Sequence, residues 1–389
     1  MGLTSEGFFW LVITGVIALP LLTVLFWSRI PGPRVVRLGS RLTLIALSQA
    51  MAVLLAALWI NNNYQLYDSW SDLMGDNGAT GSIQAAAPQS TAGAVDAKGA
   101  RPGGAQPADK LFGPLGQVLD GYQTTITGAK SKITGTVAVW LPPQYFEPAY
   151  AHVQFPVVQL LSGAPGNPQT WLIGMQAPEI LSAQVKSAES HPFVLVSASI
   201  NVDGRHNPDC SNIPGGPQVA TWLTGDVRHL VESSFRVSSN RDAWGLMGYS
   251  EGGLCASKLA LQYPQEYAAA VSISGDDVPD GDLLKPGTAA YEENSPIWLM
   301  EHERPREQVA LLLTGTRQDS DVSEEAAAMA AAAKYPASVA TLISARGGHN
   351  MGVWKSVEPQ SFDWLSAHLR APAGGTYSAV PEMLDAVTG

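Results

Sequence analysis

A serine between glycines is the residue of this chain with the clearest chemical potential. Ser250 lies in the run Gly-Tyr-Ser-Glu-Gly at 248–252, between a β-like segment at 242–247 and a helix-like segment at 254–263. Small residues on both sides let the backbone bend sharply at such a turn, which exposes the serine hydroxyl. The run therefore predicts a nucleophilic serine suited to covalent acyl chemistry. An ordinary glycine-rich turn is the alternative, because the chain contains 38 glycines.

A serine hydroxyl needs a neighbouring base to accept its proton, and His349 is the best candidate. It follows the last predicted strand, 338–345, in the run Gly-Gly-His-Asn at 347–350, about a hundred residues after Ser250. For the other histidines a structural or solvated role is expected, because they lie in predicted helices, ahead of strands or in loops: His152, His191, His206, His229, His302 and His368.

A carboxylate must complete the group by fixing the tautomer of the imidazole. Asp319 and Asp321 both follow the predicted strand 309–314. We predict Asp319, with Asp321 as the alternative acid and Glu324 or a more distant carboxylate after it. Asp321, or the nearby Ser323, could instead cap the helix that follows.

A tetrahedral intermediate also needs hydrogen-bond donors for its oxyanion. The backbone N–H of Glu251, at the start of the predicted helix, is the first expected donor. The predicted strand 157–161 ends in a glycine-containing turn at 162–166, for which an ordinary tight turn is one interpretation. The serine, the acid and the histidine come in this chain order, each just after a predicted strand, which is the order of an α/β-hydrolase.

The fold class predicted for the outer part of the chain is α/β, with a doubly wound, mainly parallel sheet. Several apolar runs are continuous rather than alternating, as in strands that are buried on both faces. The predicted strands are 134–141, 157–161, 193–200, 243–248, 268–274, 309–314 and 338–345. The predicted helices lie between or after them, at 177–187, 218–235, 251–263, 322–334 and 360–369.

Two long apolar segments precede this domain, at 8–27 and 42–60. Each is long enough to cross the hydrocarbon core of a bilayer, which is about 30 Å thick. A signal peptide is the alternative for the first, but the residues before it contain Glu6 and no Lys or Arg. The loop between the segments carries Arg29, Arg34, Arg37 and Arg41. The positive-inside rule assigns such a loop to the cytoplasm, so we predict two spans in the cell membrane with the catalytic domain on the extracytoplasmic side.

The predicted domains are a membrane anchor at 1–62, a linker at 63–109, a catalytic domain at 110–372 and a tail at 373–389. Small residues, Pro and Gln dominate the part of the linker between 75 and 107. Such a composition cannot bury enough apolar area to offset its conformational entropy, which predicts a flexible tether.

The net charge of −11 argues against a nucleic-acid partner, which would require a concentrated basic surface. No metal or cofactor site is suggested. Cys210 and Cys255 could form a disulfide if the domain is external, or Cys255 could be a lone buried thiol.

Two loop regions have open interpretations. The loop that ends at Cys210 could line the site, although a solvated loop is the preferred interpretation of Arg205, His206 and Asp209. The insertion at 275–308 could cover the site, with its apolar island at 297–300 either in an acyl pocket or lid or in ordinary packing.

Several runs together carry a family resemblance. They are Leu-Leu-Ser-Gly at 160–163 with Trp171, Thr-Gly-Asp-Val at 224–227 ahead of Phe235, the serine run at 248–253, and the histidine run at 347–350 with Trp354. Residues 110–370 thereby resemble the esterase D family of α/β-hydrolases, which includes the antigen 85-type mycolyltransferases and the S-formylglutathione hydrolase-like esterases. The resemblance implies an acyl ester or lipid substrate and a second oxyanion donor at the backbone N–H of Ala164.

The leading hypothesis is a membrane-tethered serine esterase that forms an acyl-enzyme on Ser250 and passes the acyl group to water. An acyltransferase that uses a sugar or another alcohol as acceptor is the close alternative, because the same three residues would serve both reactions. A non-catalytic binding domain with a hydrolase fold is a third hypothesis, of another class.

Overall fold

The computed structural model describes residues 2–64, 67, 70–74, 84–85, 111–116, 118–164, 166–202, 204, 206–303 and 305–372. The chain divides into two compact units, residues 1–77 with 347–353, and residues 78–346 with 354–389. Most of the predicted linker, 63–109, and all of the predicted tail, 373–389, lie outside the described residues, so the domain boundaries stay predictions.

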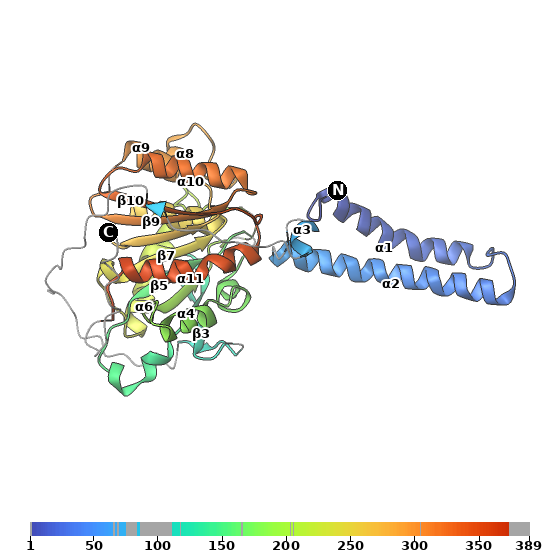
Figure 1. Cartoon of the computed structure of the whole chain (residues 1–389), viewed down its shortest axis with the longest axis horizontal. Coiled ribbons are helices and arrows are strands. Elements are labelled where there is room, and N and C mark those ends of the chain that lie inside the picture. Colours follow the sequence, from blue (N-terminus) through green and yellow to red (C-terminus); the bar gives the residue numbers. More distant parts are fainter. Residues whose placement is uncertain are drawn as a thin grey trace, which may run out of the picture. The chain divides into compact units, whose positions relative to one another are not determined.

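The first unit contains a helical hairpin of α1 (Glu6–Phe26) and α2 (Arg34–Tyr64), followed by the short α3 (Trp70–Leu73) (Figure 1). The two long helices pack so closely that an ideal Cβ on Gly15 would lie 2.5 Å from Cε of Met51. Both helices are long and apolar enough to cross a membrane, a property that signal sequences share. The two apolar segments of the sequence are therefore helical over the predicted lengths.

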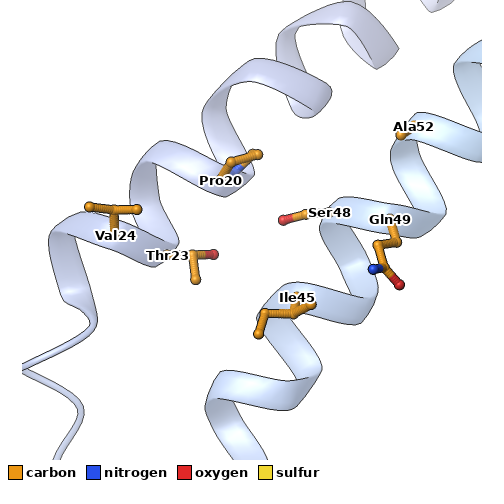
Figure 2. A pocket seen from close by; sticks show the side chains of 7 residues that line it. All are labelled: Pro20, Thr23, Val24, Ile45, Ser48, Gln49 and Ala52. Carbon is orange, nitrogen blue, oxygen red and sulfur yellow. The ribbon is translucent and has the colours of Figure 1, made fainter.

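A hollow between α1 and α2 is shown in Figure 2. The hydroxyls of Thr23 and Ser48 face this region, but each donates to a carbonyl of its own helix, at 2.7 and 2.9 Å. None of the predicted catalytic residues lines the hollow, whose walls are formed by Pro20, Thr23, Val24, Ile45, Ser48, Gln49 and Ala52. It is a gap in helix packing and not the site that the sequence predicts.

The second unit is built around one mixed sheet whose strands, within the described residues, follow the order β1-β10-β9-β8-β7-β5-β6-β4-β3-β2. From β6 through β5, β7, β8 and β9 to β10 the neighbours run parallel, whereas β4, β3 and β2 at one edge and β1 at the other pair antiparallel. The strands are β1 (Gln84–Ala85), β2 (Gly113–Pro114), β3 (Gly121–Thr127), β4 (Thr134–Trp140), β5 (Val157–Leu161), β6 (Val194–Ala198), β7 (Trp244–Tyr249), β8 (Ala269–Ile273), β9 (Val309–Thr316) and β10 (Ala337–Ser344).

The parallel strands are the continuous aliphatic runs of the sequence. Every residue of β5, β6, β7, β8 and β9 is buried, as strands covered on both faces require. The seven predicted strands are confirmed to within two residues at each end, and so is the predicted fold class. The sequence did not predict β1, β2 and β3, which are short or largely polar and lie at the edges of the sheet.

Helices cover both faces of the sheet. Successive residues of β7 point to opposite faces, and each meets a different helix. The ring of Trp244 lies 4.4 Å from Cζ of Arg228 in α6, whereas an ideal Cβ on Gly245 would lie 2.8 Å from Leu369 at the end of α11. The α-helices are α4 (Ala177–Lys186), α5 (Val219–Thr221), α6 (Arg228–Ser234), α7 (Glu251–Gln262), α8 (Ala289–Glu292), α9 (Pro296–His302), α10 (Ser320–Ala332) and α11 (Met351–His368). Tighter or wider turns occur at η1 (Pro143–Phe146), η2 (Pro148–Tyr150), η3 (Thr170–Gly174), η4 (Trp222–Val227) and η5 (Arg241–Ala243).

Two helix predictions need correction. α11 begins at Met351 rather than at 360, because the side chain of Asn350 accepts a hydrogen bond from the N–H of Val353 at 3.1 Å and caps the helix. Pro359, which favours a helix boundary in the sequence, lies inside it. The predicted helix 218–235 is divided by the π-turn η4.

The apolar island at 297–300 packs into the core. It forms most of α9, in which Leu299 and Met300 are buried, while Ile297 and Trp298 pack against the same core from partly buried positions. This arrangement supports ordinary packing, the second of the two interpretations that the sequence left open.

Three glycines let the start of α7 approach the sheet more closely than any side chain would allow. An ideal Cβ on Gly248 would lie 1.9 Å from the carbonyl oxygen of Gly252, and one on Gly252 would lie 2.0 Å from that of Leu161. Gly253 is less tightly confined, with Cα of Gly275 2.8 Å from its ideal Cβ position. The nearest atoms at Gly248 and Gly252 are all backbone, so no rotamer change could relieve a clash there.

We therefore expect Gly252→Ala to lower the free energy of unfolding by about 3 kcal/mol or more, because the new methyl group would overlap β5. Gly116→Ala is the matched control, since Gly116 is exposed and no heavy atom of the described residues lies within 4 Å of its ideal Cβ. It should change the free energy by less than about 0.5 kcal/mol. Denaturant unfolding of the two purified variants measures both values, and equal stability would contradict the packing argument.

Candidate active site

Ser250 occupies the turn between β7 and α7 with a strained backbone. Its φ of 54° and ψ of −127° are values that residues with a side chain rarely adopt. The N–H of Ser250 donates to the carbonyl of Ile273 at 2.9 Å, and the carbonyl of Ser250 accepts the N–H of Gly253 at 2.8 Å. The side chain is half-buried. Ser250 thus lies at a sharp strand-to-helix turn with the geometry of a nucleophile elbow.

The turn after β5 passes beside this serine. An ideal Cβ on Gly163 would lie 3.0 Å from Cβ of Ser250 and 2.8 Å from Cε2 of Tyr249. Ala164 follows directly and is half-buried. The turn that contains Gly163 and Ala164 therefore passes close to the serine.

The predicted site residues all follow parallel strands at the same edge of the sheet. The register aligns the carboxyl ends of β5, β7, β8, β9 and β10, so the loops that leave these strands begin side by side. These loops carry, in order of β5, β7, β9 and β10, the residues Ala164, Ser250, Asp319 and His349. Such an edge is the usual ligand-binding side of an α/β sheet.

The two candidate acids differ in burial. Asp319 is half-buried, and its N–H donates to Oγ1 of Thr316 at 3.1 Å. It holds the N-cap position of α10, yet its side chain makes no capping hydrogen bond. Asp321 is exposed inside the helix and accepts a hydrogen bond from Ser320 at 3.2 Å. The prediction that Asp321 or Ser323 caps this helix is therefore wrong, and burial favours Asp319 as the acid.

His349 is half-buried in the loop between β10 and α11. Other histidines have structural surroundings. His206 is exposed, with Nδ1 2.5 Å from Oδ2 of Asp282, and the ring of His368 stacks on Trp364 at a centroid distance of 4.0 Å. These contacts fit the structural or solvated roles expected for them.

Aromatic packing surrounds Tyr249, the residue before the serine. Its ring stacks on Trp354 with centroids 4.6 Å apart and contacts Trp171 at 5.4 Å. Burial raises the pKa of Tyr249 to about 12, so its phenol stays neutral. The two tryptophans that contribute to the family resemblance thus meet at the end of β7.

The run at 224–227 makes hydrogen bonds to the turn between β3 and β4. Asp226 is buried in η4 and accepts the N–H groups of Lys130 and Ser131, each at 2.9 Å. Burial alone would raise the pKa of Asp226, but these donated hydrogen bonds lower it overall. This carboxylate therefore ties the turn between β3 and β4 to the helices after β6.

A buried polar cluster that the sequence did not predict lies next to the serine. Glu251, Lys258 and Asp209 are 7%, 0% and 1% exposed. The interpretation of Asp209 as part of a solvated loop is therefore wrong, while Arg205 lies outside the described residues. One signal was available, because residues seven apart on a helix lie on one face, as Glu251 and Lys258 do.

Cys210 and Cys255 form a disulfide that joins the same loop to α7, with an S–S distance of 2.12 Å and a Cα–Cα distance of 5.7 Å. Both residues are buried. Of the two alternatives that the sequence left open, a disulfide or a lone thiol at Cys255, the structure contains the disulfide. Asp209 and Cys210 have φ values of 45° and 53°, which shows that the bridged segment has an unusual backbone.

A family model and one curated relative match the chain. The model of the Esterase family matches residues 130–357. An uncharacterized protein of Corynebacterium glutamicum is 24% identical over 242 residues, which cover 58% of this chain and 56% of the relative. The chain therefore spans little more than half the length of that relative.

Solved structures share the fold at low identity. A ferulic acid esterase has a TM-score of 0.51 at 17% identity, covering 63% of this chain and 97% of its own. An S-formylglutathione hydrolase from Agrobacterium tumefaciens has a TM-score of 0.55 at 17% identity, covering 64% and 95%. These likenesses show the α/β-hydrolase fold. Because the family model spans more than half of the chain, including Ser250 and His349, the protein belongs to the Esterase family.

Proposed function

We propose that this protein is a serine esterase that cleaves acyl esters through an acyl-enzyme on Ser250. Membership of the Esterase family indicates an enzyme that hydrolyses esters. The single observation that supports the nucleophile is the strained turn at Ser250, with its φ of 54°. A strained backbone is retained where the surrounding structure enforces it, and it commonly occurs at functional sites.

In the proposed reaction, Oγ of Ser250 attacks the ester carbonyl carbon while His349 accepts the hydroxyl proton. The N–H groups of Glu251 and Ala164 donate to the oxyanion, each stabilising the transition state by about 3 kcal/mol. The imidazolium then protonates the departing alcohol, and a water molecule repeats the sequence to release the acid and restore the serine. Asp319 orients the imidazole and stabilises its charged form.

Labelling with a fluorophosphonate probe tests the nucleophile. The wild-type protein should be labelled, whereas Ser250→Ala should not be labelled and should hydrolyse p-nitrophenyl acetate at least about 10⁴-fold more slowly. Ser257→Ala is the matched control, because this buried serine lies on the same helix and its hydroxyl has no hydrogen-bond partner among the described residues. A wild-type protein that resists the probe would favour the binding-domain hypothesis.

The assignment of Asp319 as the acid can also be tested. Asp319→Asn should lower kcat/KM for p-nitrophenyl acetate by about 10³- to 10⁴-fold, because the imidazole would lose its orienting carboxylate. Asp321→Asn is the control and should stay within about threefold of the wild-type value. Circular dichroism should show that both variants are folded. A larger loss in Asp321→Asn would reverse the assignment.

An acyltransferase would use the same residues with an alcohol in place of water, so analysis of the reaction products is needed to distinguish the two activities. Incubating the protein with acyl esters, with and without sugar acceptors, distinguishes free acid from a transferred ester. Hydrolysis is the reaction we favour, because water can reach a half-exposed acyl-enzyme without a dedicated acceptor site.

We further propose that the catalytic domain is tethered outside the cytoplasm by α1 and α2. Two features support this location independently. Four arginines lie in the loop between α1 and α2 and in the first two turns of α2, which favours a cytoplasmic position for this end of the hairpin. The Cys210–Cys255 disulfide is typical of proteins in oxidising compartments. The linker composition between 75 and 107 is that of a flexible tether.

Protease added to intact cells tests this topology. It should release an active, soluble catalytic domain by cleavage between 75 and 107, because this segment would then be outside the cell. A cytoplasmic marker protein that stays uncut is the control for intact membranes. If cleavage requires permeabilised cells, the orientation is the opposite one.

A further inference from the structure

Glu251 has a carboxyl group that the proposed mechanism does not use. This residue directly follows Ser250 and begins α7. Its side chain is only 7% exposed, and neither carboxyl oxygen has a hydrogen-bond partner among the residues that the structure describes. A negative charge in such surroundings is costly, because burial removes it from bulk water. The geometry therefore favours the protonated, neutral form.

The groups around Glu251 limit how many protons the cluster can lose. Nζ of Lys258 donates to the backbone carbonyl of Asp209 and to Oγ of Ser211, the latter at 2.7 Å. The carboxylate of Asp209 accepts the N–H of Gly281 at 2.8 Å. Two carboxyl groups thus share one buried cluster with one amine group. If both carboxyl groups were ionised, the cluster would carry a net negative charge.

Hydrogen bonding indicates which carboxyl keeps the proton. Within the described part of the chain Asp209 has a donor and Glu251 has none, so the proton belongs on Glu251. Burial and the charge of Asp209 raise the pKa of Glu251 to about 8, although the side chains of Asn201 and Lys258 oppose the shift.

The remaining neighbours of Glu251 act on its pKa in different directions. The side chain of Asn207 also lies close to Glu251 and, like that of Asn201, lowers its pKa. The phenol of Tyr249 faces Glu251 and stays neutral, and Asp280 adds negative charge near Asp209. Burial lowers the pKa of Lys258 overall, although the charges of Asp209 and Glu251 oppose this shift.

We propose that Glu251 is a positioning residue that must stay a neutral acid, because its ionisation would put a negative charge beside the oxyanion of the reaction. The inference rests on the proposed function, in which the backbone N–H of Glu251 is an oxyanion donor. The carboxyl group lies no farther from that N–H than the length of one side chain. Its negative charge would oppose the developing oxyanion without displacing the donor.

Because Glu251 ionises as the pH rises, we expect a loss of activity at alkaline pH. Below its pKa Glu251 is neutral and the oxyanion site works, whereas above it the ionised form accumulates and kcat falls. With a pKa of about 8, kcat should be about tenfold lower at pH 9 than at pH 7.

The experiment measures kcat and KM of the full-length protein in detergent, with p-nitrophenyl acetate from pH 6 to 10 and the rate of Ser250→Ala subtracted. In Glu251→Gln the alkaline fall of kcat should disappear, because an amide does not ionise in this range. At pH 7 this variant should have about fivefold lower kcat, since the amide adds an N–H donor that the pocket must satisfy. Glu147→Gln, an exposed control, should keep the wild-type profile.

Asp209→Asn gives a test that leaves Glu251 intact. Asparagine tolerates the φ of 45° at this position and can still accept the N–H of Gly281. Removing the charge of Asp209 should make Glu251 easier to ionise, so the alkaline fall should move to lower pH by about one unit. This variant decides the question if Glu251→Gln fails to fold.

An unchanged alkaline fall in Glu251→Gln would overturn the inference and assign the titration to another group, such as Lys258. A wild-type pH profile in Asp209→Asn would overturn it as well. Failure of the proposed function is distinguishable, because Ser250→Ala would then hydrolyse the ester as fast as the wild type at every pH.

Discussion

The structure depends on a backbone-to-backbone contact between the start of α7 and the end of β5. The carbonyl of Leu161 occupies the space where a side chain on residue 252 would begin, 2.0 Å from the ideal Cβ of Gly252. With glycines on both sides, the chain can reverse from strand to helix within one residue. That residue is Ser250, whose positive φ is the consequence. The positions of the proposed nucleophile and the proposed first oxyanion donor are therefore products of close packing.

The same contact explains why polar groups are buried behind the serine. A helix that starts hard against the sheet carries its first side chain, Glu251, into the interior along with the backbone. Lys258, two turns later on the same face, is buried for the same reason. The loop with Asp209 and Cys210 closes over both, and the disulfide to Cys255 keeps it there. A neutral Glu251 is the least costly way to fill this space, since a buried cluster tolerates one ion pair better than an excess charge.

Features that depend on nearby residues could be predicted from the sequence, whereas most features that depend on residues far apart in the chain could not. Strands such as β5 and β9 were predictable, because continuous aliphatic runs need no knowledge of their partners. The turn at Ser250 was predictable from local glycines. The burial of Asp209 was not, because it depends on Lys258 and Gly281, which lie 49 and 72 residues away. The start of α11 was missed for a local reason: Pro359 suggests a boundary, and the cap at Asn350 outweighs it.

The disulfide and the arginine-rich loop bear on location through unrelated physics. In the proposed topology the loop acts during membrane insertion, where positive charge resists translocation. The disulfide depends on the redox state around the folded domain, since a reducing cytosol would leave Cys210 and Cys255 as thiols. Without the bridge, a segment with φ values of 45° and 53° would be held to α7 chiefly by the hydrogen bonds of Lys258. An oxidising compartment therefore stabilises the cover over Glu251 directly, so the proposed location and the proposed state of the site support each other.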